Sequence, residues 1–310
     1  MLKSLFARNS GAKNNNRLGI SFDSEHVSVA YAEIDSNGVA IQRCHSEPLK
    51  EDYSASVKQA LKQVGAPSCP ANVALSLEDS TIHKVEKPKV PPEELDGSIL
   101  FLLKDRLSHS VEDTMVATIT YPKDCRHDDH LMAVEVHKSR ITQIVDALHA
   151  AHVDINAIDL TELNLGDMLE DDDTMTKGLA ILVEHSRGVS LLVYRNHELY
   201  LIRRINGISD LISCLPAPGN DQMAEMLMLE IQRTFDYYDS LMGQPLPARL
   251  YLAPTIMDLQ PLAEHLDSNL ALTVEALDLN NIIDSADAMS PAMQHDLLSA
   301  IAACYREDKQ

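Results

Sequence analysis

The stretch LGISFDSEHVSVAYAEI, residues 18–34, has the pattern of two short apolar strands joined by a tight polar turn. The strands are expected over 18–22 and 26–34, where β-branched and aromatic residues alternate with small or polar ones. The turn carries an acid, Asp23, at its start. Asn37-Gly38 follows the second strand, and Asn-Gly is the strongest short signal for a hairpin. We therefore predict a three-stranded meander in this region.

The same layout recurs in the second half of the chain. Strands are expected at GLAILVE (178–184), VSLLVYR (189–195) and ELYLIRRI (198–205), with polar turns between them. This self-similarity indicates an internal duplication in which each copy leads one lobe. Helical and strand patterns follow each copy, which is typical of an α/β fold.

A further β/α unit is predicted between the two copies. An apolar helix starts at PPEE (91–94), because proline and acids are typical of a first helical turn. Strands are expected over 114–121 and 131–136, followed by an amphipathic helix over 138–154. The acidic run 170–178 is expected to be a solvated linker.

These patterns predict five parts of the chain. They are a basic flexible N-terminal tail (1–17), a first lobe (18–89), an inserted small subdomain (90–155), a return segment with the acidic linker (156–177) and a second lobe (178–310).

The composition limits the classes of function. The formal net charge is −21, which excludes a nucleic-acid partner because a phosphate backbone requires a basic face. No apolar run approaches the ~20 residues of a membrane helix, and no secretory signal is evident. The five cysteines are scattered without a CxxC pair, which favours a reducing compartment. We expect a soluble cytoplasmic protein.

The first 17 residues carry four cations and no acid, with Leu2, Leu5 and Phe6 near one face of a potential helical turn. Two interpretations stay open for this segment. It could make weak contact with an anionic membrane surface, or it could be a frayed basic tail.

No metal site is expected from the sequence. Cys125, His127 and His130 lie together, but no second ligand pair accompanies them. Asp171–Asp173 lacks the glycine and the terminal glutamate of a calcium loop.

Three motifs resemble those of the FtsA and PilM branch of the actin-like ATPases. PPEELDGSILFLLKDRL (91–107) is similar to a family helix that starts with proline. EMLMLEIQRTFDYYDS (225–240) is similar to the family's E-I-x-R-S-L-D-Y-Y helix, and LLSAIAACYRED (297–308) to its closing helix. The resemblance extends over 18–307 and, within the branch, is strongest to the MshI proteins, the PilM counterparts of MSHA pilus systems. It implies an actin-like, ribonuclease H-like duplicated fold of two lobes with an inserted FtsA/PilM-type small subdomain.

The resemblance also locates a nucleotide site. In the family, two hairpin turns hold the phosphates of ATP through backbone N–H groups, and glycine lets the backbone approach them. The first family turn, G-I-D-I-G-S, falls on Gly19–Ser24, so that Ser21 replaces its acid and Asp23 its second glycine, followed by Ser24. A carboxylate at a phosphate position repels a polyanion.

The two other family motifs are also altered. The second turn, V-D-I-G, falls on 182–185, where Val183 replaces the acid and His185 the glycine; a shift by one residue would offer Glu184 as the acid. The adenosine motif, a Gly-Gly pair, falls on Ala253 and Pro254, and proline lacks the N–H and fixes φ. We therefore expect a degenerate nucleotide site, no cofactor and no enzyme activity, with a working actin-like ATPase that still binds ATP as the alternative.

By the same resemblance, the partner is the cytoplasmic tail of a PilN-like bitopic inner-membrane protein, with an assembly ATPase as a further candidate. The protein would then be a scaffold of a type IV, MSHA-type pilus assembly platform at the cytoplasmic face of the inner membrane. The expected groove residues are Ile99, Leu102, Leu103, Val116, Ile119 and Val134. A cytoplasmic L-type protein of type II secretion is the remaining alternative.

Overall fold

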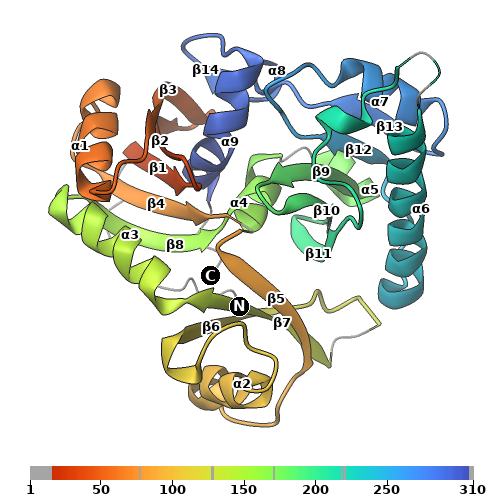
Figure 1. The fold of residues 1–310 in the computed structure, drawn as a ribbon, viewed down its shortest axis with the longest axis horizontal. Coiled ribbons are helices and arrows are strands. Elements are labelled where there is room, and N and C mark those ends of the chain that lie inside the picture. The colour runs from red at the N-terminus through yellow and green to blue at the C-terminus, as the bar shows by residue number, and fades with distance from the viewer. Residues whose placement is uncertain are drawn as a thin grey trace.

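The fold contains two large β-sheets and one small one (Figure 1). A computed structural model describes residues 16–76, 78–126, 129–169, 172–217, 219 and 221–306. Each of the two large sheets forms the centre of one lobe, and the small sheet lies beside both of them.

The first lobe is built on a six-stranded sheet with the order β14-β3-β2-β1-β4-β8. β1 to β3 form the predicted antiparallel meander, and β4 and β8 run parallel to β1. The strands are β1 (Asn16–Phe22), β2 (His26–Asp35), β3 (Gly38–Pro48), β4 (Pro70–Leu75), β8 (Asp154–Leu160) and β14 (Asp284–Ser285). Helices α1 (Tyr53–Val64) and α3 (Lys138–Ala150) bury their apolar faces against one side of this sheet.

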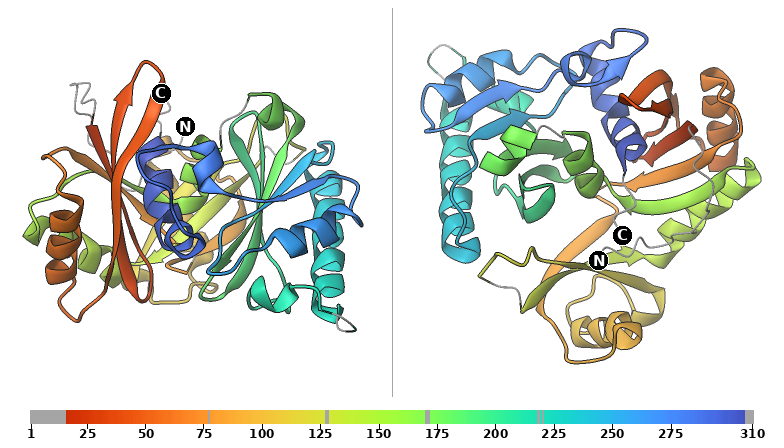
Figure 2. Two further views of the ribbon diagram at one scale, coloured as in Figure 1. Left: turned by 90° about the horizontal axis from the view of Figure 1, so that it is seen from above. Right: turned by 180° about the vertical axis from the view of Figure 1, so that it is seen from behind.

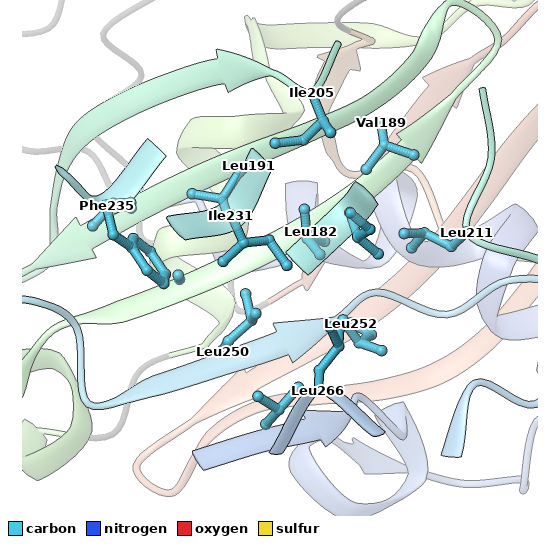
Figure 3. Close-up of a cluster of buried hydrophobic side chains, with 14 of the residues drawn as sticks. Leu182, Val189, Leu191, Ile205, Leu211, Ile231, Phe235, Leu250, Leu252 and Leu266 are labelled. Atoms are coloured by element: carbon cyan, nitrogen blue, oxygen red, sulfur yellow. The ribbon is translucent and has the colours of Figure 1, made fainter. Parts of the chain in front are cut away.

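The second lobe repeats this topology. Its sheet has the order β11-β10-β9-β12-β13, again an antiparallel meander followed by two parallel strands, which confirms the predicted duplication. The strands are β9 (Leu179–His185), β10 (Gly188–Arg195), β11 (Glu198–Arg204), β12 (Arg249–Leu252) and β13 (Thr273–Ala276). The outer elements are the 3-10 turn η3 (Ile212–Cys214), α6 (Gln222–Met242) and α7 (Gln260–Asp267). Figure 3 shows Ile231 and Phe235 of α6 and Leu266 of α7 packed against the strands.

A layer of helices lies between the two large sheets (Figure 2, left). It is formed mainly by α4 (Thr161–Met168) and α9 (Pro291–Tyr305), with α5 (Asp172–Lys177) and α8 (Leu279–Ile282) nearby. One apolar cluster takes residues from both sheets and both main helices, including Ala30, Ile181, Leu165 and Ile301. Both sides of α9 are therefore apolar, and Ser290 caps its start by accepting the N–H of Met293.

The small subdomain contains the three-stranded sheet β5-β7-β6. Its elements are β5 (Ser80–Glu86), the 3-10 turn η1 (Pro92–Glu94), α2 (Leu95–Leu103), the 3-10 turn η2 (Val111–Asp113), β6 (Thr114–Thr120) and β7 (His130–His137). The subdomain thus takes its elements from 80–137, whereas the sequence suggested 90–155. The residues of β5 fell within the predicted first lobe, but β5 pairs with β7. The helix α3 was placed in the insertion and most of β8 in the return segment, but both pack with the first lobe. Strand periodicity gives the buried face of a strand and not its partner, which explains this error.

Two further expectations need correction. The segment 170–178 is not only a solvated linker, because α5 forms there and buries Met175 completely. Asn16 and Arg17 belong to β1 rather than to a flexible tail. The rest of that tail, residues 1–15, lies outside the described residues. Among the described residues, no helix has the length and apolar character needed to cross a bilayer.

Candidate functional site

The β1–β2 turn uses its own acid to satisfy its backbone. Oδ1 of Asp23 accepts the N–H groups of Glu25 and His26, each at 2.6 Å. The backbone N–H of Asp23 donates to the carbonyl of His26 at 3.1 Å, which closes the turn. Two of the N–H groups that this turn could offer to an anion are therefore already bonded. The Asp23 carboxylate occupies the position that such an anion would take. Ser24 is exposed at the tip of the turn.

Gly19 and Ser21 lie earlier on β1, on the face opposite to Ile20 and Phe22. A Cβ at Gly19 would come within 1.9 Å of the Ala300 carbonyl oxygen and 2.9 Å of Cys304 Sγ. The glycine is thus required where α9 crosses β1, which is a packing role. Ser21, the residue that replaces the family acid, is buried.

The β9–β10 turn holds a neutral histidine. The N–H of Arg187 donates to Nδ1 of His185 at 3.3 Å, so the ring proton lies on Nε2, which is 3.0 Å from Ser190 Oγ. Burial, together with the cations Arg187 and Arg204, lowers the pKa of His185 to about 4. The imidazole side chain fills the space that a glycine would leave open.

The alternative acid of this turn is engaged elsewhere. Oε2 of Glu184 accepts the N–H of Leu211 at 2.9 Å, which ties it to the loop before η3. Val183 is half-buried and packs against the apolar cluster between the sheets.

Ala253 and Pro254 follow β12 at the same sheet edge, because β12 runs parallel to β9. The N–H of Ala253 donates to the Leu182 carbonyl at 2.9 Å, and Ala253 is buried. The Pro254 carbonyl lies 3.1 Å from Nδ1 of His295 on α9. The end of β12 therefore packs onto the helix between the lobes.

The two hairpin turns converge on the segment between β4 and β5. Arg140, in the first turn of α3, donates through Nε to Asp79 Oδ1 at 2.8 Å and through Nη2 to the Asp23 carbonyl at 3.4 Å. Burial raises the pKa of the Asp79 carboxyl, although the Arg140 guanidinium opposes this shift. From the second turn, Ser186 Oγ donates to Glu78, and Arg187 Nη2 donates to the Ser80 carbonyl at 2.8 Å. Hydrogen bonds thus link both turns to residues 78–80, the first turn through Arg140.

A second polar group lies at the start of α4. Burial raises the pKa of Glu162 to about 8, and its Oε2 has no hydrogen-bond partner. Oγ1 of Thr161 and Nδ2 of Asn164 are also buried without a partner. The Tyr194 hydroxyl donates to the Glu162 carbonyl and so fixes the backbone at this point.

The residues expected to line a partner groove differ in accessibility. Ile99 and Leu103 are fully buried in the core of the small subdomain, and Ile119 and Val134 are buried in the cluster shared with the first lobe. Val116 is half-buried. Leu102 is 56% exposed, and its neighbour Phe101, which we did not expect, is 68% exposed. α2 therefore presents Phe101 and Leu102 outward and Ile99 and Leu103 inward.

Among the described residues, no group of three or more His, Cys, Asp or Glu side chains is placed to hold a metal ion. Cys125 of the CRHDDH segment is buried, and His127 lies outside the described residues, as does Asp171.

No family model matches this chain, and no curated protein does. Solved structures do match, and they define the class: a two-lobed α/β protein with the actin-like ATPase fold. A Bacteroides thetaiotaomicron protein described by that fold, with unknown function, has a TM-score of 0.56 at 11% identity, covering 94% of this chain and 96% of its own.

The chain is similar in particular to PilM. The structure of a PilM-PilN type IV pilus biogenesis complex matches with a TM-score of 0.68 at 15% identity, over 94% of this chain and 98% of that one. The cytoplasmic domain of EpsL, an inner-membrane component of the Vibrio cholerae type II secretion system, matches with a TM-score of 0.52 at 12% identity, over 94% and 96%. At these identities the matches establish the fold.

Sequence reasoning found the two turns and missed what joins them. Arg140 and Asp79 are 61 positions apart, and Glu78 and Ser186 are 108 apart. No local pattern marks such pairs. The only sign in the sequence that these turns differ from phosphate-binding turns was the set of altered residues within them.

Proposed function

We propose that this protein is a non-catalytic scaffold of a type IV pilus assembly machine, of the MSHA type, that binds the cytoplasmic tail of a PilN-like membrane protein. The similarity to PilM over nearly the whole of both chains supports the pilus assignment. The MSHA assignment rests on the sequence resemblance to the MshI proteins.

The absence of catalysis is proposed from one observation above all. Asp23 Oδ1 accepts two backbone N–H groups of the turn that would have to receive a phosphate. A nucleotide would have to displace this carboxylate and overcome its repulsion, which grows as water is excluded. His185 and Pro254 add obstacles at the second turn and at the end of β12, so the residues present do not fit a Mg-nucleotide.

Calorimetric titration with Mg-ATP tests this part of the proposal. No heat of binding is expected up to millimolar nucleotide, and micromolar binding would contradict the proposal and favour a working actin-like ATPase. An Asp23→Gly variant frees the two N–H groups but leaves His185 and Pro254 in place. We therefore expect this variant, like the wild type, not to bind Mg-ATP.

For the partner we propose the exposed side of α2. A short tail adds little area, so its affinity depends on a few apolar anchors. Phe101 and Leu102 are adjacent, apolar and more than half exposed, and Lys104 lies over the Phe101 ring at 4.9 Å from its centroid. The partner tail would cover these two side chains.

The experiment measures binding of synthetic cytoplasmic tails of PilN-like proteins by fluorescence anisotropy. We expect Phe101→Ala with Leu102→Ala to weaken binding at least about tenfold, the loss of a modest hot spot. Leu229→Ala is the matched control, because Leu229 is 49% exposed on α6 in the second lobe. Equal binding by the α2 double variant and the wild type would show that the tail docks elsewhere.

A cytoplasmic L-type protein of type II secretion is the second candidate, favoured by the similarity to EpsL. Binding of tails from secretion-system components, with no binding of pilus-system tails, would select it. An assembly ATPase can be included in the same assay as a further partner.

A further inference from the structure

The small subdomain contacts the second lobe at two separate places. The first lies where β5 begins: Glu78 accepts from Ser186, and the Ser80 carbonyl accepts from Arg187 at 2.8 Å. Both donors belong to the β9–β10 turn. The same short segment is held to the first lobe by Asp79, through Arg140.

The second place is the loop after β6, which reaches the end of α6 (Figure 1). The backbone N–H of Arg126 donates to the Met242 carbonyl at 3.2 Å, and its guanidinium donates to the Ser240 carbonyl at 3.2 Å. Carbonyls at the end of a helix lack intrahelical partners, and a cation there also complements the helix dipole. This loop thus supplies a cap for α6.

The loop is also anchored by neighbouring residues. Gln244 Nε2 donates to the Asp124 carbonyl at 2.9 Å, and the hydroxyl of Tyr200, on β11, donates to the Asp124 carboxylate. Cys125 is buried within the apolar core of the second lobe. Tyr121 packs against the cores of both lobes, and burial raises the pKa of its hydroxyl to about 12.

We propose that the small subdomain is a bracket that fixes the second lobe relative to the first, through residues 78–80 at one end and 124–126 at the other. A ligand bound between two lobes stabilises the closed arrangement by binding both of them. Here the residues that bond the two lobes together belong to the chain itself, so the arrangement is held without a ligand. The bracket does not depend on the identity of the partner that binds α2.

The ion pair at the first end is well suited to this role. The Arg140 and Asp79 side chains are 16% and 11% exposed, and Arg140 also donates to the Tyr53 hydroxyl at 3.2 Å. Removing one member of such a pair leaves the other charge buried and unpaired. The segment 78–80 is thereby tied to the first lobe through Asp79.

Hydrogen exchange followed by mass spectrometry tests the bracket. The double variant Arg187→Ala with Gln244→Ala removes one donor at each end and leaves both side chains of the buried pair, Arg140 and Asp79, in place. We expect exchange to increase about tenfold in peptides covering 185–188 and 124–126, while the central strands β1 and β9 keep their protection. Unchanged exchange in both contact segments would overturn the proposal.

Arg249→Ala is the matched control. Arg249 pairs with Glu275 at 2.9 Å within the second lobe, so its loss should leave both contact segments unchanged. Small-angle scattering gives a second readout: we expect a larger radius of gyration for the double variant than for the control, and equal radii would count against the bracket. Protection of the two turns by millimolar Mg-ATP in the wild type would show that nucleotide, not the bracket, holds the lobes.

Discussion

Gly19 on β1 faces the Ala300 carbonyl on α9 so closely that a Cβ would lie 1.9 Å from the oxygen. The helix between the lobes therefore rests directly on the backbone of the first strand. The glycine that resembles part of a phosphate-binding turn is explained by this packing alone.

Gly19→Ala should destabilise the fold. The obstructing atom is backbone, so α9 or β1 must shift, and overpacking of this kind costs about 3 kcal/mol. Urea unfolding measures the change. Gly97→Ala is the control: apart from its chain neighbours and its own helix backbone, no heavy atom lies within 4 Å of the added Cβ, and alanine in a helix should stabilise by about 0.5–1 kcal/mol. A loss below about 0.5 kcal/mol for Gly19→Ala would mean that the helix has room to move.

Arg17→Ala should loosen the end of α9. Nη1 of Arg17 donates to the carbonyls of Cys304 at 2.8 Å and Arg306 at 2.6 Å, so a charged donor holds the helix C-terminus against β1. We expect a loss of about 2 kcal/mol, the range for hydrogen bonds to charged groups. Arg17→Lys should recover part of it. Unfolding midpoints of the three proteins test this, and equal midpoints would contradict it.

Glu162→Gln should change the pH dependence of stability between about pH 4.5 and 8. Burial raises the pKa of Glu162 from 4.5 to about 8 in the folded protein, so the unfolded state binds fewer protons between these values. The wild type therefore loses stability as the pH rises from about 4.5 to 8, by about 1.4 kcal/mol for each unit of the pKa difference.

Glutamine does not ionise, so the variant should lack this loss and gain stability over the wild type as the pH rises. Chemical unfolding at a series of pH values gives the comparison. Parallel profiles for the two proteins would show that the pKa of Glu162 is not raised in the native state.

His185→Gln should act on the acid side. Its pKa is lowered from 6.5 to about 4, so the unfolded state binds more protons between these values and stability falls as the pH drops through this window. Glutamine can still bond with Ser190 and does not titrate. The variant should therefore lose less stability than the wild type between pH 6.5 and 4. An NMR titration of the His185 ring is an independent check, and a pKa near 6.5 would rule out this explanation.

The sequence predicted the two meanders and most of the helices because these depend on local periodicity. Leu18, Ile20 and Phe22 alternate with Gly19 and Ser21, and that alternation already separates the two faces of β1. It also identified the altered residues of both turns, since a residue type at a motif position can be read directly.

Other features were beyond local patterns. The assignment of β5 to the small subdomain and of β8 to the first lobe required knowledge of strand partners. Ile99 and Leu102 look alike in sequence, and only the packing of α2 decides that one is buried and the other exposed.

The sequence by itself thus determined most of the segments that form strands and helices, that the layout is duplicated, and that the turns carry unusual residues. The tertiary structure decided that Gly19 receives α9 and that residues 78–80 and 124–126 join the small subdomain to the second lobe. The physical reason is the range of the interactions. Periodicity and turn chemistry act over a few residues, whereas these contacts join atoms that are far apart in the chain and meet only when the lobes pack.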